Sequence, residues 1–135
     1  MSDKWKSKNR HKYLLQYHII FVCKYRKNIL SNKEYSDYVK QLSYEICRKH
    51  NVVVKEMETD KNHIHYMIET EPTICISKIV KIMKSYTTYN MWKMYGENLK
   101  MHFWKENTLW TDGYFACSIG NVSEIQLKTY IQNQG

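Results

Sequence analysis

Two neighbouring segments restrict the fold more than any other part of the chain. Residues 52–59 (VVVKEMET) are rich in β-branched side chains, and residues 63–69 (HIHYMIE) also have the composition of a strand. The three residues between them, Asp60, Lys61 and Asn62, are typical of a turn. The pair is therefore predicted to form a β-hairpin, which must join further strands or helices because an isolated hairpin is barely stable in water.

Periodic patterns before and after this hairpin predict one more strand and two helices. Residues 17–25 (YHIIFVCKY) are dense in aromatic and β-branched side chains, as expected of a central strand. Apolar side chains at spacings of three and four predict a helix from Ser31 to about His50. A second stripe of the same kind predicts a helix over residues 76–95, capped by Gly96.

The last part of the chain is predicted to add a strand and a helix. Residues 97–112 show weak periodicity and are expected to form a loop, and residues 113–119 (GYFACSI) resemble a strand. A capping-box pattern at Ser123 and Gln126 begins a helix that ends near Gln134. The order β, α, β, β, α, β is that of the ferredoxin-like (RRM-like) plan. We therefore expect one α+β domain over residues 1–135, with an antiparallel sheet, two helices on one face and a C-terminal helix.

The charge balance favours a nucleic-acid partner. Lys and Arg outnumber Asp and Glu by 21 to 13 in 135 residues, which gives a net charge of +8. Five of these cations lie among the first 12 residues and are equally well explained as a solvated terminus. The remainder of the chain is still net positive without them, so the basic character belongs to the whole domain.

Cysteine spacing and hydropathy exclude several other classes. The four cysteines are widely spaced with no CxxC pair, which argues against a structural zinc site or a redox motif. No apolar run approaches the length of a membrane span, and no signal segment follows the polar N-terminus. The sequence therefore predicts a cytoplasmic protein whose cysteines are reduced.

Two histidines on the second strand of the hairpin are candidate metal ligands. Strand alternation sends His63 and His65 to one side and Ile64 and Tyr66 to the other. Residues two apart on a strand are separated by roughly 6–7 Å, from which two imidazoles can bind one divalent ion. Pairs of this kind are also found among surface or structural histidines that bind no metal, so the pair needs support from elsewhere in the chain.

The predicted last helix supplies this support. Tyr130 and Gln134 are four residues apart and share one helix face. The chain has 12 tyrosines, and a tyrosine on an amphipathic helix often serves packing alone. The combination of paired histidines, a terminal Tyr-x-x-x-Gln, a basic domain and an uncovered sheet face favours a DNA-processing site.

With these features the chain resembles the small single-tyrosine HUH transposases of the IS200/IS605 type over nearly its full length. The His-hydrophobic-His element and the terminal Tyr-x-x-x-Gln occur in the order and on the elements that this family requires. Four stretches carry the resemblance: VCKYRKNIL from Val22, METDKNHIHYMI from Met57, LWTDGYFACSIG from Leu109 and SEIQLKTYIQNQG from Ser123.

The resemblance implies a role for individual residues. Tyr130 matches the nucleophile that attacks the scissile phosphate, which gives a 5′-phosphotyrosine link and a free 3′-OH. His63, His65 and Gln134 match the ligands of a Mg²⁺ or Mn²⁺ ion, and Asp60 is similar to an acidic position that assists the metal. Because one ester replaces another, rejoining needs no ATP, in agreement with a sequence that lacks a P-loop motif.

The resemblance also implies partners. Such enzymes bind hairpins in single-stranded DNA at transposon ends. Because each chain supplies one nucleophilic tyrosine, cutting two transposon ends implies a homodimer. Gly120 has the backbone freedom of a hinge, so we expect the terminal helix of one subunit to complete the site of the other. Lysines and arginines suit phosphates, and aromatic rings suit unpaired bases. Candidates for DNA contact are Lys24, Arg26, Lys27, Lys78, Lys81, Lys84, Trp104 and Trp110. Ordinary solvation explains the three lysines of the predicted second helix equally well, and packing is the commoner role for the two tryptophans.

Three other functions are compatible with the same pattern. A domesticated relative would cut repeated palindromes without mobilising itself, and a replication-initiation nickase would use similar chemistry in a larger chain. A non-catalytic nucleic-acid-binding module with a ferredoxin-like sheet would bind DNA with no role for the histidines. Such a module has no need of Tyr130 with Gln134, so a covalent protein–DNA adduct distinguishes it from the enzymes.

Overall fold

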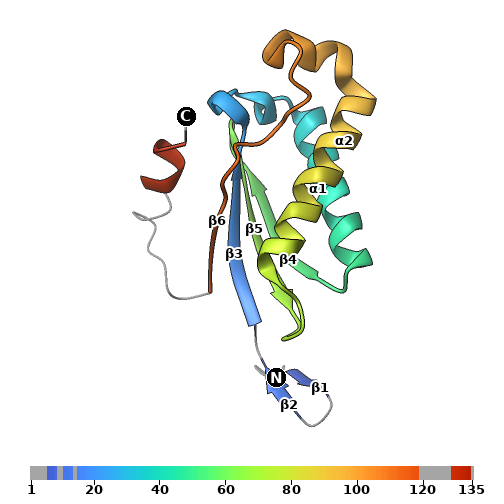
Figure 1. Cartoon of the computed structure of the whole chain (residues 1–135), viewed down its shortest axis with the longest axis vertical. Coiled ribbons are helices and arrows are strands. Elements are labelled where there is room, and N and C mark those ends of the chain that lie inside the picture. The colour runs from blue at the N-terminus through green and yellow to red at the C-terminus, as the bar shows by residue number, and fades with distance from the viewer. Residues whose placement is uncertain (1–5, 9–10, 14, 119–128, 135) are drawn as a thin grey trace.

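The chain folds around a four-stranded antiparallel sheet in the order β4-β5-β3-β6 (Figure 1). The structure is a computed structural model, and it describes residues 6–8, 11–13, 15–118 and 129–134. Helices α1 and α2 cover one face of the sheet (Figure 1), as the ferredoxin-like plan predicts. The elements are β3 (Leu15–Val22), α1 (Lys33–Lys49), β4 (Val53–Thr59), β5 (His63–Thr70), α2 (Ile76–Phe103) and β6 (Phe115–Ser118).

The pairing register decides which side chains lie on the uncovered face of the sheet. The central strands β3 and β5 are paired over their whole length, from Leu15 with Thr70 to Val22 with His63. Odd-numbered residues of β3 and even-numbered residues of β5 pack under the helices in the core. Directly paired residues share a face. The opposite face therefore carries the even-numbered residues of β3 together with the odd-numbered residues of β5.

Helix α1 forms as predicted, with a small change at its start. Asn32, rather than Ser31, is the N-cap, and its side chain accepts hydrogen bonds from the backbone N–H groups of Glu34 and Tyr35. Ser31 instead ends the short 3₁₀ turn η2 (Ile29–Ser31). The buried stripe of α1 consists of Tyr35, Val39, Leu42 and Ile46, all of which the spacing predicted.

Helix α2 is longer than predicted, because Gly96 does not cap it. The helix continues to Phe103, with a local departure from helical geometry at Tyr95 (φ −124°). Leu99 and Phe103 are buried beyond the glycine. Burial of two large apolar side chains outweighs the roughly 1 kcal/mol that a glycine costs inside a helix. Residues 97–103 of the predicted loop are therefore helical.

The first predicted strand also differs at its ends. Strand β3 begins at Leu15 and stops at Val22, after which the 3₁₀ turn η1 (Lys24–Arg26) reverses the chain. The N-terminal basic segment includes two short strands, β1 (Lys6–Lys8) and β2 (His11–Tyr13), which pair with each other. The fourth predicted strand is confirmed over Phe115–Ser118, whereas the predicted hinge and capping box lie outside the described residues.

Candidate active site

His63 and His65 lie on the face of the sheet opposite α1 and α2, as the alternation predicts. They pair with Val22 and Ile20 of the central strand β3, and both side chains are half-buried. Burial lowers the pKa of both imidazoles, and the charge of Asp60 opposes this effect at His63. Both rings are therefore favoured in the neutral form, in which one nitrogen keeps a lone pair for a metal.

Hydrogen bonds orient the two rings. The Nδ1–H of His63 donates to Oδ1 of Asn62 at 3.0 Å, which leaves the lone pair on Nε2. Nε2 of His65 shares a hydrogen bond of 2.8 Å with Nδ1 of His18, and the two rings are stacked with centroids 5.0 Å apart. His18 thus belongs to the site although the sequence analysis did not identify it. Its place on a strand was visible in the sequence, but the register that brings it to His65 was not.

Asp60 occupies the turn before His63. Its Oδ1 accepts a hydrogen bond from the backbone N–H of Lys61 at 2.8 Å, and its own N–H donates to the carbonyl of His63 at 3.0 Å. These contacts close the hairpin. The aspartate is exposed, and its negative charge offsets part of the burial that lowers the pKa of His63.

Tyr130 lies in a helical turn, residues 129–132, on the side of the sheet opposite α1 and α2 (Figure 1). Its ring packs against Phe115 of β6 with centroids 5.3 Å apart. Its hydroxyl is buried and has no hydrogen-bond partner among the described residues. Burial raises the pKa of Tyr130 to about 12, so the phenol stays protonated at neutral pH.

The Tyr130 hydroxyl and the Gln134 amide oxygen converge over Gly113. A Cβ placed on this glycine would lie 3.9 Å from the hydroxyl and 4.0 Å from Oε1 of Gln134. Tyr130 in the helical turn and Gln134, two residues after that turn, therefore bring both groups to one point just before β6. The predicted helix to Gln134 ends earlier, at residue 132.

The two halves of the site are separated by one strand. Gly113 stands between Thr111, whose N–H donates to the carbonyl of Val22, and Phe115, which pairs with Ile20. Val22 in turn pairs with His63 on its other side. Two strand spacings, roughly 10 Å, separate the backbone at Gly113 from that at His63. Within the described residues no group of three His, Cys, Asp or Glu side chains is arranged to hold a metal.

Two cations fix the surroundings of Tyr130. The Lys84 ammonium donates to the carbonyls of Thr111 and Gly113 at 2.7 Å and of Asp112 at 3.3 Å. Burial lowers the pKa of Lys84, and the three carbonyls offset part of that penalty. Arg26 donates from Nη1 to the carbonyl of Gln132 at 2.7 Å, which ties the turn η1 to the helical turn that carries Tyr130.

Two of the remaining DNA-contact candidates are engaged by other residues, and four are exposed. Trp110 is buried, packs on Phe21 and donates its indole N–H to Thr87, so it belongs to the core. Lys24 pairs with Asp112 at 3.3 Å. Four candidates are exposed: Lys27, Lys78, Lys81 and Trp104.

Comparison with known proteins supplies the family. A family model described as "Transposase IS200 like" matches residues 11–134. The ISDra2 transposase TnpA of Deinococcus radiodurans is 30% identical over 122 residues, 90% of this chain and 85% of that protein. The transposase for insertion sequence element IS200 of Salmonella typhimurium is 28% identical over 120 residues, 88% of this chain and 76% of that protein.

Solved structures agree with the sequence comparisons. A Deinococcus radiodurans R1 crystal structure assigned as a transposase superposes with a TM-score of 0.87 at 26% identity, covering 96% of this chain and 97% of that one. A REP-associated tyrosine transposase bound to a REP hairpin shares the fold with a TM-score of 0.56 at 13% identity, covering 96% of this chain and 70% of that one. In the described residues no helix is long and apolar enough to cross a membrane. Since the family model spans nearly the whole chain, the chain belongs to the family of IS200-like transposases.

Proposed function

We propose that this transposase cuts and rejoins single-stranded DNA through Tyr130. The Tyr130 oxygen attacks the scissile phosphorus, the phenol proton leaves, and the P–O bond to the 3′ oxygen breaks to give a free 3′-OH and a 5′-phosphotyrosine. Attack by a new 3′-OH reverses these steps and restores the phenol. The observation that supports this assignment is the convergence of the Tyr130 hydroxyl and the Gln134 amide over Gly113, on the sheet face that also carries His63 and His65.

The donor atoms of the candidate residues are of kinds that suit a divalent metal ion, although one strand separates Gln134 from the two histidines. We propose that His63, His65 and Gln134 hold Mg²⁺ or Mn²⁺, with Asp60 close by in the turn. Lone-pair nitrogens on neutral imidazoles and an amide oxygen suit such an ion, Mn²⁺ better than Mg²⁺ because two donors are nitrogens. When bound, the ion polarises the phosphoryl oxygen and stabilises the charge that develops on it.

The chain's own residues have complementary tasks. A phenol whose pKa is raised to about 12 is a weak nucleophile at neutral pH, so its proton must leave as the phosphate binds. Asn62 and His18 orient the two imidazoles through the hydrogen bonds described above. Phe115 and Arg26 hold the turn that carries the hydroxyl.

We propose hairpins in single-stranded DNA at transposon ends as the substrate. The net charge of +8 and the exposed Lys78 and Lys81 on α2 suit a phosphate backbone. The REP-associated transposase that shares this fold was solved with a hairpin bound. A domesticated palindrome-cutting role uses the same site and differs in the DNA that surrounds the gene.

A denaturation-resistant adduct tests the proposal. The full chain is incubated with labelled single strands carrying hairpins and Mn²⁺, and a covalent band is sought after denaturation. We expect the band with the natural sequence, none with Tyr130→Phe, and an unchanged band with Tyr89→Phe, which removes a hydroxyl from an exposed ring. An adduct that persists in Tyr130→Phe assigns the nucleophile elsewhere, and no adduct in any variant favours a DNA-binding module without cleavage.

We further propose that the active form is a homodimer with exchanged terminal helices. In a single chain, residues 129–134 dock on their own sheet through the contacts of Tyr130 with Phe115 and of Gln132 with Arg26. A mixed dimer of a Tyr130→Phe chain and a His63→Ala chain separates the two arrangements. Restored cleavage, with the adduct on the His63→Ala chain, supports exchange. A mixed dimer that binds hairpins but never cuts supports docking on the same subunit.

A further inference from the structure

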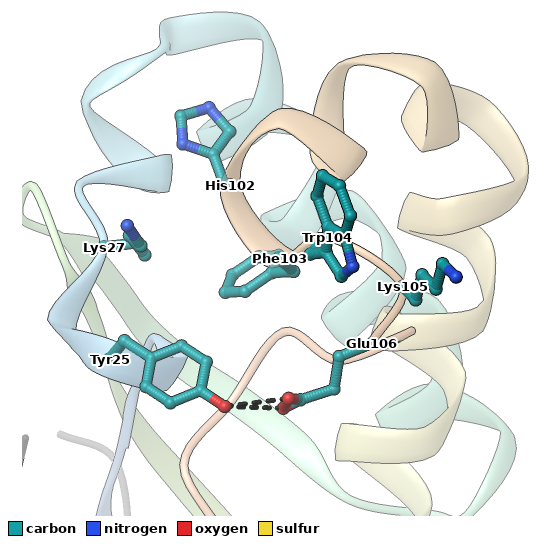
Figure 2. Close-up of a pocket in the computed structure, with 7 residues that line it drawn as sticks. All are labelled: Tyr25, Lys27, His102, Phe103, Trp104, Lys105 and Glu106. Atoms are coloured by element: carbon teal, nitrogen blue, oxygen red, sulfur yellow. Dashed lines mark hydrogen bonds between the residues drawn. The ribbon is translucent and has the colours of Figure 1, made fainter.

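A hollow of about 570 Å³ opens between the turn after β3 and the end of α2 (Figure 2). Phe103 is only 3% exposed and forms its floor, whereas Tyr25 and Trp104 are 52% and 77% exposed. Figure 2 shows the Phe103 ring between those two aromatic side chains. We call this hollow the Trp104 pocket, and its lining is Tyr25, Lys27, His102, Phe103, Trp104, Lys105 and Glu106.

The backbone around the Trp104 pocket is strained. Four non-glycine residues have a positive φ in the described part of the chain, and Tyr25 (59°), Arg26 (52°) and Trp104 (57°) are three of them. Trp104 combines its φ with a ψ of −125°, a conformation that glycine adopts far more readily than a bulky residue. Such strain persists at ligand sites, where the residue serves binding rather than packing. An indole that is both strained and exposed contributes little to the core.

Charge and shape indicate the class of ligand. Lys27 and Lys105 flank the aromatic rings, and a second hollow of about 730 Å³ shares Trp104 and Lys105 and adds Lys100. Cations beside exposed aromatic rings are the pattern with which proteins bind single-stranded nucleic acid, through phosphates and stacked bases. A base inside a duplex has both of its faces covered, so only an unpaired base can stack on these rings.

The single carboxylate of the pocket, Glu106, favours bases whose edge donates hydrogen bonds. Both oxygens of Glu106 accept from the Tyr25 hydroxyl, at 2.8 and 3.0 Å. A carboxylate only accepts hydrogen bonds, and guanine offers adjacent N1–H and N2–H donors that match two oxygens. We infer that the Trp104 pocket binds one unpaired base of the DNA, with guanine preferred, and that guanine displaces the Tyr25 hydroxyl from Glu106. This inference rests on the proposed function, because it assigns a subsite for the same substrate.

One residue connects the pocket to the candidate active site. Arg26 follows Tyr25 in the turn η1, and its guanidinium binds the carbonyl of Gln132, two residues after Tyr130. One strand of DNA that stacks a base on Tyr25 and Trp104 therefore lies beside the turn that carries the nucleophile. The base in the pocket fixes the position of that strand relative to Tyr130.

Fluorescence anisotropy with short labelled thymidine strands that carry one central dG, dC or dA tests the inference on the full chain without metal. We expect the dG strand to bind best. Trp104→Gly should weaken binding about 5- to 150-fold, the range of losing one base–aromatic stack. Trp104→Phe should retain most of the affinity. The control variant Tyr89→Ala, which removes a 67% exposed ring from α2 outside this pocket, should bind as the natural chain does.

The melting temperature separates binding from a structural role. Glycine relaxes the backbone at position 104, so Trp104→Gly should melt at the same or a higher temperature while it binds more weakly. Unchanged affinity, or a fall in both quantities, overturns the inference. Glu106→Gln should abolish the preference for dG, and a preference that survives overturns the role of the carboxylate.

The adduct assay keeps the two proposals apart. Trp104→Gly should raise the DNA concentration that gives half-maximal adduct by the same factor as it weakens binding, because the proposed nucleophile itself is unchanged. A natural chain that binds the dG strand through Trp104 but never forms an adduct would refute the proposed cleavage and leave the pocket standing. An adduct formed by a chain whose binding does not depend on Trp104 would support the proposed cleavage and refute the pocket.

Discussion

Removing the hydroxyl of Tyr130 should abolish DNA cleavage and at the same time increase the stability of the folded chain. In the folded chain this oxygen is buried and has no hydrogen-bond partner among the described residues. Burying an unpaired hydroxyl costs about 1–3 kcal/mol in proteins. Tyr130→Phe deletes the unpaired group and keeps the ring contact with Phe115. We therefore expect the variant to lose all cleavage while its terminal turn docks more firmly, by about 1 kcal/mol.

The pKa of Tyr130 predicts in which pH range the stability of the natural chain falls. Burial raises the pKa of Tyr130 to about 12, whereas a free tyrosine has a value of 10.0. The folded chain therefore favours the neutral phenol, and the stability linked to it is complete below pH 10 and is lost between pH 10 and 12. This gap corresponds to at most about 2.7 kcal/mol, and the partial exposure of the side chain reduces it to about 1–2 kcal/mol. Tyr130→Phe has no phenol to ionise and does not lose this stability, so its excess in free energy of unfolding over the natural chain should grow between pH 10 and 12.

Absorbance of tyrosinate measures the titration directly. Subtracting the alkaline titration curve of Tyr130→Phe from that of the natural chain isolates one phenol among the 12 tyrosines. The difference curve should have its midpoint near pH 12. A midpoint near 10 would show that the hydroxyl is in water and that the turn does not dock as described. A variant that unfolds at lower denaturant than the natural chain would refute the claim that the hydroxyl is unpaired.

Three further outcomes follow from the site. Lys84→Met leaves three backbone carbonyls without their charged donor, so we expect a loss of about 2–3 kcal/mol in urea unfolding, and an unchanged midpoint would contradict this role. His63→Ala should abolish Mn²⁺ binding in calorimetry without changing the circular dichroism, whereas undiminished binding would remove this residue from the metal site. Gly113→Ala adds a methyl at ordinary contact distance from Tyr130 and Gln134 and should keep the activity. The bulkier Gly113→Val should displace both groups and reduce cleavage at least tenfold, and full activity would place the reacting atoms elsewhere.

Most of the fold could be predicted because its elements have clear periodicities. The hairpin, α1 and the start of α2 follow from alternation and from apolar stripes. The end of β3 did not follow, since Tyr25 is a good strand former locally. The left-handed backbone of Tyr25 (φ 59°) and Arg26 (φ 52°) in η1 turns the chain away from the sheet instead. The prediction that Gly96 caps the second helix was wrong for a similar reason. The burial of Leu99, which keeps the helix intact, depends on packing partners distant in sequence.

The candidate site was predictable where it depends on one element at a time. Strand alternation placed His63 and His65 on one face of the sheet, as the structure has them, whereas the roles of Tyr130 and Gln134 rest on the family resemblance and stay predictions. His18 required the cross-strand register, which a single strand pattern does not contain. The exposure of Trp104 depends on a backbone conformation at the end of α2, and composition alone favoured packing.

The two halves of the site differ in how firmly they are held. His63 and His65 stand on β5, which is paired on both sides along most of its length, so their backbone positions are fixed by the core. The hydroxyl of Tyr130 depends on a short helical turn seated by a ring contact with Phe115 and a hydrogen bond from Arg26. Bringing the proposed nucleophile across one strand to the histidines is therefore far less costly as a movement of the turn than as a distortion of the sheet. Arg26 follows Tyr25 of the Trp104 pocket and binds the carbonyl of Gln132, so the proposed base in the pocket is connected to the turn of Tyr130 rather than to β5.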